Sequence, residues 1–249
     1  MPEPGELAFR LVDAGSFDAI PAPARPGARC QTCDYWERLD GSREHPDAAP
    51  ARDLKLSRLM AGARLAGSYG MLAHRTDDAG DAVAAGWAQF GPISAYPRAL
   101  SIRERYPELP DSPPPWVITC LQVPPDAPDR DAVGAALLGA VCEELDRRGI
   151  IAVEAYPEAA DDPWVPSPGP AALYLVAAFE QAAGDERFPV MRRELGASGE
   201  VGWGDLLARS KPPDDEGDAW PLPLPSGPKE EDLFKLPEKP KRPNPFGDD

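Results

Sequence analysis

The sequence predicts an α/β fold with a mixed central sheet, and three consecutive segments carry that prediction. Residues 116–123 (WVITCLQV) are the best strand candidate of the chain, being rich in Val, Ile, Leu and Trp. An amphipathic helix follows them, and residues 150–156 are a second β-rich run that Pro157 ends. Strand, helix and strand in close succession form a βαβ unit, in which we expect the two strands to be parallel.

The helix of this unit has one apolar face. Its apolar residues recur every four positions, at Val133, Leu137, Val141 and Leu145. Arginines at 147 and 148 complement the dipole at its carboxyl end, and Gly149 favours termination there. A further helix and closing strands are expected before residue 195.

The first half of the chain predicts additional elements. Residues 7–12 (LAFRLV) predict a first strand, and residues 16–21 (SFDAIP) predict the start of a short helix. Residues 53–65 carry apolar side chains on a helical period, with Asp53 as the expected N-cap.

A β-hairpin is expected next. Residues 68–75 (SYGMLAHR) and 82–92 (AVAAGWAQFGP) flank a polar turn that contains Asp78 and Gly80. Residues 92–115 are then expected to form a loop or a lid that ends in consecutive prolines.

The composition excludes several classes of function. The 249 residues include 26 Lys and Arg against 42 Asp and Glu, which gives a formal net charge of −16. So acidic a surface repels phosphate backbones, and nucleic acid is therefore not an expected partner. The sequence has no apolar run long enough for a membrane span, and its first residues lack the apolar core of a signal peptide. We therefore expect a cytoplasmic protein that contacts no membrane.

The cysteines form neither a disulfide framework nor a zinc pattern. Cys120 and Cys142 fall in apolar settings that suit a buried free thiol. Cys30 and Cys33 form a lone CxxC, whereas a zinc site needs two more ligands at similar spacing and the chain has only 2 histidines. We expect no metal site, and a structural or incidental role for the CxxC pair.

Several short motifs follow one another along the chain: CQTCDYWE at 30–37, GWAQFGP at 86–92, VITCLQVP at 117–124, VEAYP at 153–157 and PVMRREL at 189–195. Together and in this order they resemble the GNAT superfamily of acetyl-CoA-dependent N-acetyltransferases. The resemblance covers residues 28–195 and implies the GNAT fold, a mixed sheet with splayed parallel strands flanked by helices. Residues 1–27 are then an N-terminal strand and connector.

Residues 196–249 are expected to form a proline-rich acidic tail that is mostly disordered or extended, because such a composition buries too little apolar surface to offset its ordering entropy. The tail has PxxP spacings, of the kind that polyproline-binding domains recognise, although a proline-rich segment also produces them by chance. A protein partner for the tail is therefore one expectation.

The resemblance implies acetyl-CoA as co-substrate, bound in a V-shaped opening between the two parallel strands. Its pantetheine arm would pair with the backbone of Leu121, Gln122 and Val123. Its pyrophosphate would rest on amides at the start of the next helix, where unpaired N–H groups and the helix dipole favour an anion. The residues implied there are Arg130, Ala132, Val133, Gly134 and Ala135.

This pyrophosphate loop departs from the family pattern. Asp129 stands where the family has Gln or Arg, Asp131 adds a second acid, and Ala132 replaces the first glycine. Aspartates at a helix start stabilise the helix and take the electrostatic role that an anion would have had. We therefore expect CoA binding to be weakened or lost.

Two residues are candidates for catalysis. Tyr174 stands where many relatives place the general acid that reprotonates the departing CoA thiolate; the alternative is a tyrosine packed at the boundary of helix and sheet. Glu154, midway along the second parallel strand, is a candidate general base acting through water; the alternative is a structural hydrogen bond within the splayed sheet.

These residues lead to two hypotheses of different classes. The first is an N-acetyltransferase that transfers an acetyl group from acetyl-CoA to an amine on a small molecule or a protein. The second is a catalytically inactive GNAT-fold protein that binds or scaffolds through its surface and its C-terminal tail. The acidic surface favours cationic acceptors such as polyamines or lysine-rich proteins.

Overall fold

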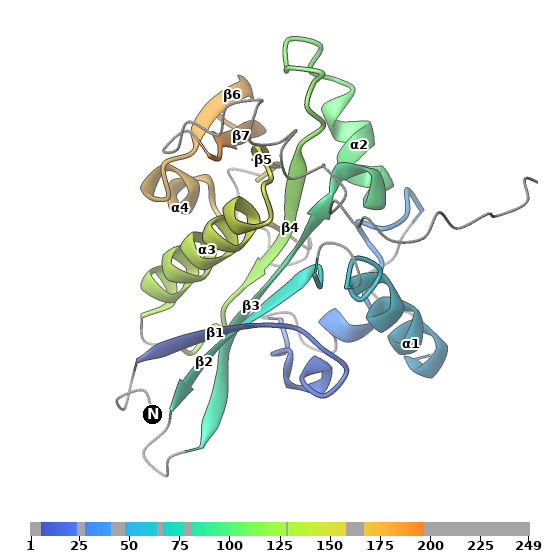
Figure 1. Ribbon diagram of the computed structural model, residues 1–249, viewed down its shortest axis with the longest axis vertical. Coiled ribbons are helices and arrows are strands. Elements are labelled where there is room, and N and C mark those ends of the chain that lie inside the picture. The colour runs from blue at the N-terminus through green and yellow to red at the C-terminus, as the bar shows by residue number, and fades with distance from the viewer. Residues whose placement is uncertain are drawn as a thin grey trace, which may run out of the picture. The chain divides into compact units, whose positions relative to one another are not determined.

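The computed structural model describes residues 6–23, 28–40, 48–63, 67–76, 81–127, 129–157 and 167–196. A seven-stranded sheet in the order β1-β2-β3-β4-β5-β7-β6 runs through these residues (Figure 1). Its strands are β1 (Leu7–Leu11), β2 (Gly70–Thr76), β3 (Ala82–Pro92), β4 (Trp116–Gln122), β5 (Ala152–Ala155), β6 (Glu180–Gly184) and β7 (Pro189–Glu194). The pair β4 and β5 is parallel and the other neighbouring pairs are antiparallel. The predicted α/β class with a mixed sheet and one βαβ unit is confirmed.

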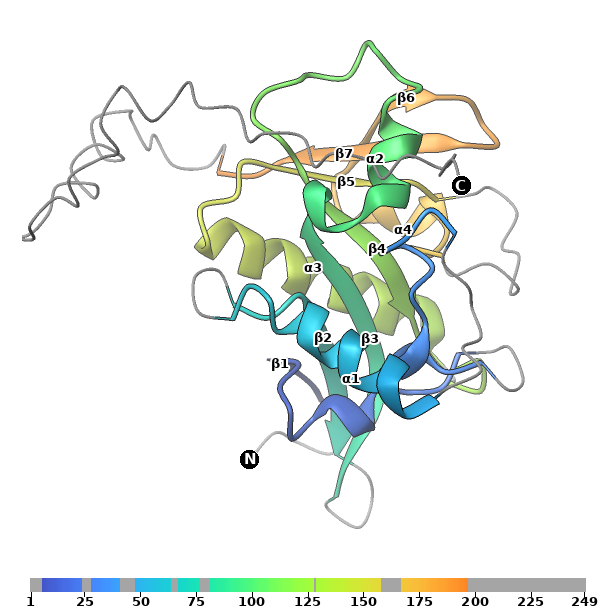
Figure 2. The same cartoon turned by 90° about the vertical axis from the view of Figure 1, so that its right-hand side faces the viewer.

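Helices cover both faces of this sheet. One face carries α3 (Arg130–Arg147) and α4 (Ala171–Val176), and the other carries α1 (Ala48–Leu59) and α2 (Pro97–Arg103) (Figures 1 and 2). A buried apolar cluster fills each interface, so the sheet is the middle layer of three. Within the described ranges, no helix is both long enough and apolar enough to cross a membrane.

The helix α3 packs as its sequence period predicts. Its four-residue apolar repeat is fully buried against the sheet, with 0% exposure at Val133, Leu137, Val141 and Leu145. The helix ends at Arg147, and Gly149 just beyond it has a φ of 74°, the left-handed conformation that a glycine adopts at low cost. The local sequence pattern of α3 therefore agrees with its packing against the sheet.

Two expectations for the first half of the chain are wrong. The helix expected at 53–65 is α1, which begins at Ala48 and ends at Leu59, so Asp53 lies inside it and is not its N-cap. Alanines and a proline at its start are favourable in a first helical turn, and they begin the helix earlier. The segment 92–115 is not simply a loop or lid, because it contains α2, which starts with Pro97 at its first turn.

The N-terminal strand belongs to the same sheet as the rest of the domain. β1 pairs antiparallel with β2, from Leu7 opposite Arg75 to Leu11 opposite Met71. The hairpin predicted next is confirmed as β2 and β3. The expected tail lies almost wholly outside the described residues, so its extended character remains a prediction.

Burial of Cys142 predicts a loss of stability at alkaline pH. Burial raises the pKa of this thiol from an ordinary value of 9.0 to about 11. Between those values the unfolded thiol ionises while the folded thiol keeps its proton, so the stability present below pH 9 is lost as the pH rises towards 11. We expect Cys142→Ala to reduce this loss by roughly 1–3 kcal/mol, measured by urea unfolding at several pH values. Curves for the two proteins that stay parallel up to the alkaline limit would contradict this explanation.

Candidate active site

The opening expected between the parallel strands begins where β4 and β5 part. They are in register from Trp116 opposite Val153 to Ile118 opposite Ala155. β5 ends at that point, whereas β4 continues to Gln122. The next residues after β5 include Pro157, which has no N–H group to continue the ladder. The edge of β4 beyond Ile118 is therefore not paired with β5.

That free edge is met by a turn that leads into α4. The backbone N–H of Leu121 donates to the carbonyl oxygen of Ser167 at 3.1 Å. The side-chain amide of Gln122 lies 3.5 Å from the same oxygen. Leu121 and Val123 are buried and Gln122 is half-buried. Of the three residues implied for the pantetheine arm, Leu121 thus has its amide already bonded within the chain.

The start of α3 lies at the end of the same strand. Asp129 precedes the helix but makes no side-chain cap bond with it. Its carboxylate instead accepts a hydrogen bond from Arg75 of β2 at 2.7 Å, and this bond lowers the pKa of Asp129. Asp129 therefore does not cap α3 through its side chain, and Arg75 brings a second positive charge to the loop beside that of Arg130.

The residues implied for the pyrophosphate divide into two groups. Arg130 and Ala132 are exposed in the first turn of α3. Val133 is buried, and its N–H is already used by the carbonyl of Asp129 at 3.0 Å. Gly134 is buried where α4 approaches, since a Cβ added there would lie 3.0 Å from a methyl group of Leu173.

Ala135 is half-buried in the following turn. Of the positions implied for the pyrophosphate, those in the exposed first turn of α3 are thus the ones that a ligand can reach, and the later ones serve packing.

Tyr174 lies in the core between α4 and the sheet. It is 0% exposed and stacks edge-on against Phe179, with 5.0 Å between the ring centroids. Its hydroxyl donates to the carbonyl oxygen of Pro168 at 2.7 Å. Burial raises its pKa well above the ordinary value, so the phenol keeps its proton. These contacts match the packed tyrosine that the sequence left as an alternative, and an acid role requires the hydroxyl to leave Pro168.

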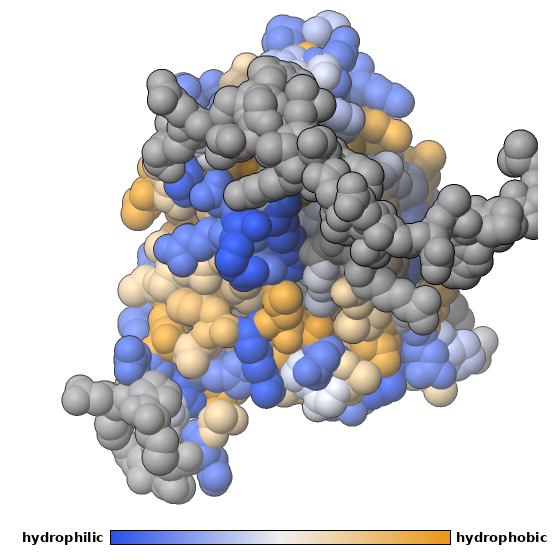
Figure 3. Space-filling view, viewed as in Figure 1, coloured by the Kyte–Doolittle hydropathy of each residue, from blue (hydrophilic) through white to orange (hydrophobic). Residues whose placement is uncertain are grey.

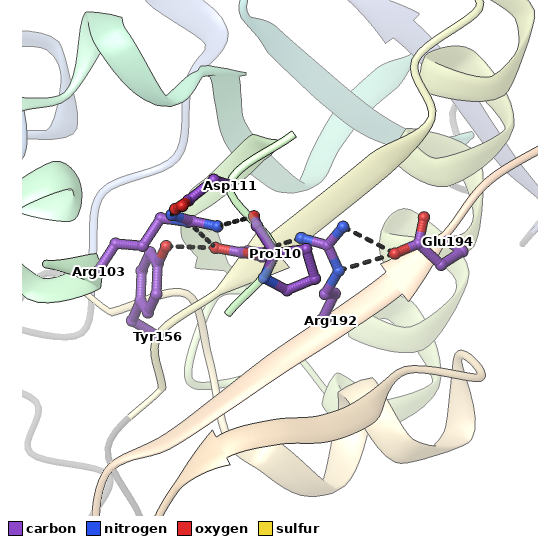
Figure 4. A network of polar contacts seen from close by, with 7 residues as sticks. Arg103, Pro110, Asp111, Tyr156, Arg192 and Glu194 are labelled. Atoms are coloured by element: carbon purple, nitrogen blue, oxygen red, sulfur yellow. Dashed lines mark hydrogen bonds and ion pairs between the residues drawn. The ribbon is translucent and has the colours of Figure 1, made fainter. Parts of the chain in front are cut away.

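Glu154 is surrounded by protein donors. Figure 4 shows three of them, Arg103, Tyr156 and Arg192, pointing toward one another. The residue is 0% exposed on β5, and one carboxylate oxygen accepts from Arg192 of β7 at 2.6 Å. The other accepts from the hydroxyl of Tyr156 at 2.6 Å and from Arg103 of α2 at 3.2 Å. Arg192 also bonds Glu194, at 2.8 Å from its Nε. The carboxylate thus joins a helix and two strands, as the structural alternative for Glu154 expects.

The donors around Glu154 are themselves held in place. Arg103 also donates to the carbonyl of Pro110, in the segment that follows α2. Burial works against the charged form of Arg192, but its bonds to Glu194 and Glu154 outweigh burial and raise its pKa. Burial, and then the charge of Glu154, raise the pKa of Tyr156. Tyr156 therefore remains a hydrogen-bond donor to Glu154.

A second buried polar cluster lies on the face of the sheet that α1 and α2 cover, the face to which α2 also brings Arg103. Lys55 of α1 donates to the side chains of Glu37 and of Gln89, the latter at 2.8 Å, and Gln89 donates to Glu37 at 2.8 Å. All three residues are buried, and one oxygen of Glu37 has no hydrogen-bond partner. Burial works to lower the pKa of Lys55, but the charge and hydrogen bond of Glu37, together with the neighbouring thiols of Cys33 and Cys120, outweigh burial and raise the pKa. Cys30 and Cys120 belong to the apolar cluster on the same face, and burial raises the pKa of both thiols.

Three of the sequence motifs meet on this face of the sheet, in the polar cluster and the apolar cluster beside it. CQTCDYWE supplies Glu37, GWAQFGP supplies Gln89, and VITCLQVP supplies Cys120. The four cysteines are free thiols. In the part of the chain that the structure describes, no group of three or more His, Cys, Asp or Glu side chains is placed to hold a metal ion.

A surface hollow lies at the carboxyl end of α3. Figure 3 shows hydrophilic residues gathered near the middle of this face, over that part of the helix. The hollow is far from the start of α3, where the phosphates are expected, and it contains no candidate residue. Its lining comes from α3 and from the end of β7: Cys142, Glu143, Asp146, Arg193, Glu194, Leu195 and Gly196.

The sequence did not indicate the cations that pair with Glu37, Asp129 and Glu154. Lys55, Arg75 and Arg103 come from elements far from their partners in the sequence, so no local pattern indicates them. Arg192 did leave a signal, because it lies inside PVMRREL while Glu154 lies inside VEAYP. Opposite charges within two otherwise apolar strands indicate a buried pair.

No protein-family model and no curated protein matches this sequence. Solved structures do resemble the described fold. One is a mosquito arylalkylamine N-acetyltransferase-like protein (5b), with 12% identity and a TM-score of 0.48, in which 76% of this chain and 100% of that chain are covered. Another is yncA from Salmonella typhimurium with its cofactor acetyl-CoA, at 16% identity and a TM-score of 0.45. The match covers 77% of this chain and 95% of yncA. A third is an N-acetyltransferase from Staphylococcus aureus, at 14% identity and a TM-score of 0.43. The match covers 76% of this chain and 98% of that protein.

The network around Glu154 predicts a large effect of Arg192→Met. The substitution leaves the carboxylate buried with one cation fewer, and we expect a loss of about 3–5 kcal/mol in the free energy of unfolding, measured with urea. Arg187→Met, at an exposed arginine before β7, is the control and should change stability by less than about 0.5 kcal/mol. Equal losses of unfolding free energy in the two variants would show that the buried pair of Arg192 and Glu154 contributes no more to stability than an exposed arginine does.

The Lys55 cluster predicts non-additive substitutions. Lys55→Met leaves Glu37 as a buried anion without its cation, and should cost about 3–5 kcal/mol of stability. Adding Glu37→Leu removes the orphaned charge and should restore part of the loss, so the double variant is more stable than the sum of the single effects. The control is Arg52→Met on the same helix, whose exposed pair with Asp18 contributes less than about 1 kcal/mol. Strict additivity in urea unfolding would refute the pairing.

Proposed function

We propose that this chain is a GNAT-type N-acetyltransferase that transfers an acetyl group from acetyl-CoA to an amine. The observation that carries the proposal is the parting of β4 from β5 after Ile118, with the start of α3 at the end of the same strand. A backbone edge that leads to a helix start suits an elongated ligand with amide groups at one end and phosphates at the other. Acetyl-CoA has that form.

The phosphate end of the proposed site is supported by charge and exposure. The first turn of α3 is exposed at Arg130 and Ala132, and Asp129 does not cap it. Amides at an uncapped helix start attract anions. Arg75, bonded to Asp129, offsets one of the acids that weaken the loop.

The acyl end of the proposed site lies along β4. Leu121, Gln122 and Val123 would pair with the pantetheine arm, and a backbone N–H at this edge would stabilise the oxyanion as the amine attacks. Acetyl-CoA supplies the activated acetyl thioester. Tyr174 is the proposed acid for the leaving thiolate once its hydroxyl is released from Pro168.

Glu154 has a weaker claim to act as the base. Its carboxylate contacts three protein donors, so its supported role is to position β5 against β7 and α2. Proton removal from the amine through water stays a prediction for this residue. For the acceptor we propose a cationic amine, because the net charge of −16 attracts such molecules.

Two observations favour the second candidate function, a GNAT-fold binding or scaffolding protein without transferase activity. The amide of Leu121 and the hydroxyl of Tyr174 are both engaged within the chain. Two acids, Asp129 and Asp131, also remain at the phosphate end. The tail through which such a protein would act lies outside the described residues.

Titration calorimetry with acetyl-CoA separates the two functions. The transferase proposal expects micromolar binding, and Ala132→Leu should weaken it about tenfold or more because the larger side chain covers the first turn of α3. The control is Ala136→Leu, one turn further along the same helix, which should bind as the native protein does. Failure to bind at millimolar acetyl-CoA would rule out the transferase and leave the binding protein.

A further inference from the structure

Two groups assigned to the acyl end of the proposed site are bonded to adjacent carbonyls of one turn. The amide of Leu121 donates to the oxygen of Ser167 at 3.1 Å, and the hydroxyl of Tyr174 donates to the oxygen of Pro168 at 2.7 Å. One group lies on β4 and the other on α4. Residues 167–170 therefore satisfy both donors at once.

The conformation of the 167–170 segment (Ser167, Pro168, Gly169 and Pro170) explains how it reaches both donors. Its two prolines restrict φ, and Gly169 has a φ of 91°, which favours glycine. The hydroxyl of Ser167 accepts from the N–H of Gly169 at 3.1 Å. The segment is thus shaped by its own residues and presents two successive carbonyls.

The fit against β4 is close. A Cβ added at Gly169 would lie 3.2 Å from Cδ2 of Leu121, so the turn packs on the same residue whose amide it binds. Pro170 is the N-cap of α4, and its carbonyl accepts from the N–H of Leu173 at 3.1 Å. The segment lies where a ligand paired with the amide of Leu121 would have to lie.

We propose that the 167–170 segment is an autoinhibitory strap that holds the acyl end of the site closed. This inference rests on the proposed function, because it concerns access of CoA to β4. In the closed state the carbonyls of Ser167 and Pro168 take the places of acceptors on the ligand. Displacing the strap frees the Leu121 amide for the pantetheine arm and the Tyr174 hydroxyl for the thiolate.

A closed strap lowers the apparent affinity for the ligand, because only molecules with an open strap can bind it. The smaller the open fraction, the weaker the apparent binding. Substitutions that weaken the strap should therefore tighten binding, a direction opposite to ordinary damage at a binding site. Gly169→Ala places a side chain in a left-handed conformation and against Leu121. Tyr174→Phe removes the bond to Pro168 without changing the packing of the ring.

Titration calorimetry with coenzyme A itself tests the strap, since it measures binding without acetyl transfer. We expect the dissociation constant to fall by about threefold or more in each variant. Gly149→Ala is the matched control for the glycine, because it has a φ of 74° and no neighbouring atom within 4 Å of an added Cβ. Tyr96→Phe is the control for the tyrosine, because its buried hydroxyl also donates to a carbonyl, that of Phe90 at 2.9 Å. Both controls should bind as the native protein does.

The outcomes separate the strap from the function. If the native protein binds coenzyme A and neither variant binds it more tightly, the strap is refuted and the transferase proposal stands. If no protein in the set binds at millimolar concentration, both are refuted. Circular dichroism checks that the variants fold, and if Gly169→Ala does not, Tyr174→Phe decides alone.

Discussion

The short parallel pairing of β4 and β5 is the constraint on which the rest of the domain depends. The strands are in register only up to Ile118 and Ala155, and β3 holds the opposite edge of β4 throughout. A strand that outlasts its neighbour must satisfy its remaining amides elsewhere. The turn at residues 167–170 and the start of α3 both lie where β4 continues alone, so the candidate site follows from this one departure.

The network around Glu154 fixes β5 against β7 and α2 just before β5 and β4 part. Glu154 is in register with Val117, one position before the last paired residues. Its donors arrive from α2 through Arg103 and from β7 through Arg192, so a single carboxylate joins three elements. Buried ion pairs seldom add much net stability, but they penalise arrangements in which a partner is missing. The network therefore favours the one arrangement of β5, β7 and α2 in which every partner of the carboxylate is present.

Local patterns in the sequence were sufficient for the fold and insufficient for the site. The period of α3 and the apolar run of β4 are properties of neighbouring residues, and both predictions hold. Glu154 was found as a candidate, yet its role depends on Arg103 and Arg192, which approach it only through tertiary structure. The hydrogen bond from Leu121 to Ser167 could not be predicted from the sequence for another reason. It joins main-chain atoms, which every residue has, so no choice of side chain reveals it.

The same bond sets where affinity for any ligand on β4 has to arise. A ligand that takes the Leu121 amide replaces one carbonyl acceptor by another, and such an exchange yields little net free energy. The strand can therefore align a ligand without holding it tightly. The binding energy has to come from parts of the ligand that displace only water, namely those that reach past Val123 towards the exposed first turn of α3. A ligand bound at the proposed site would therefore be aligned by β4 and held mainly at the start of α3.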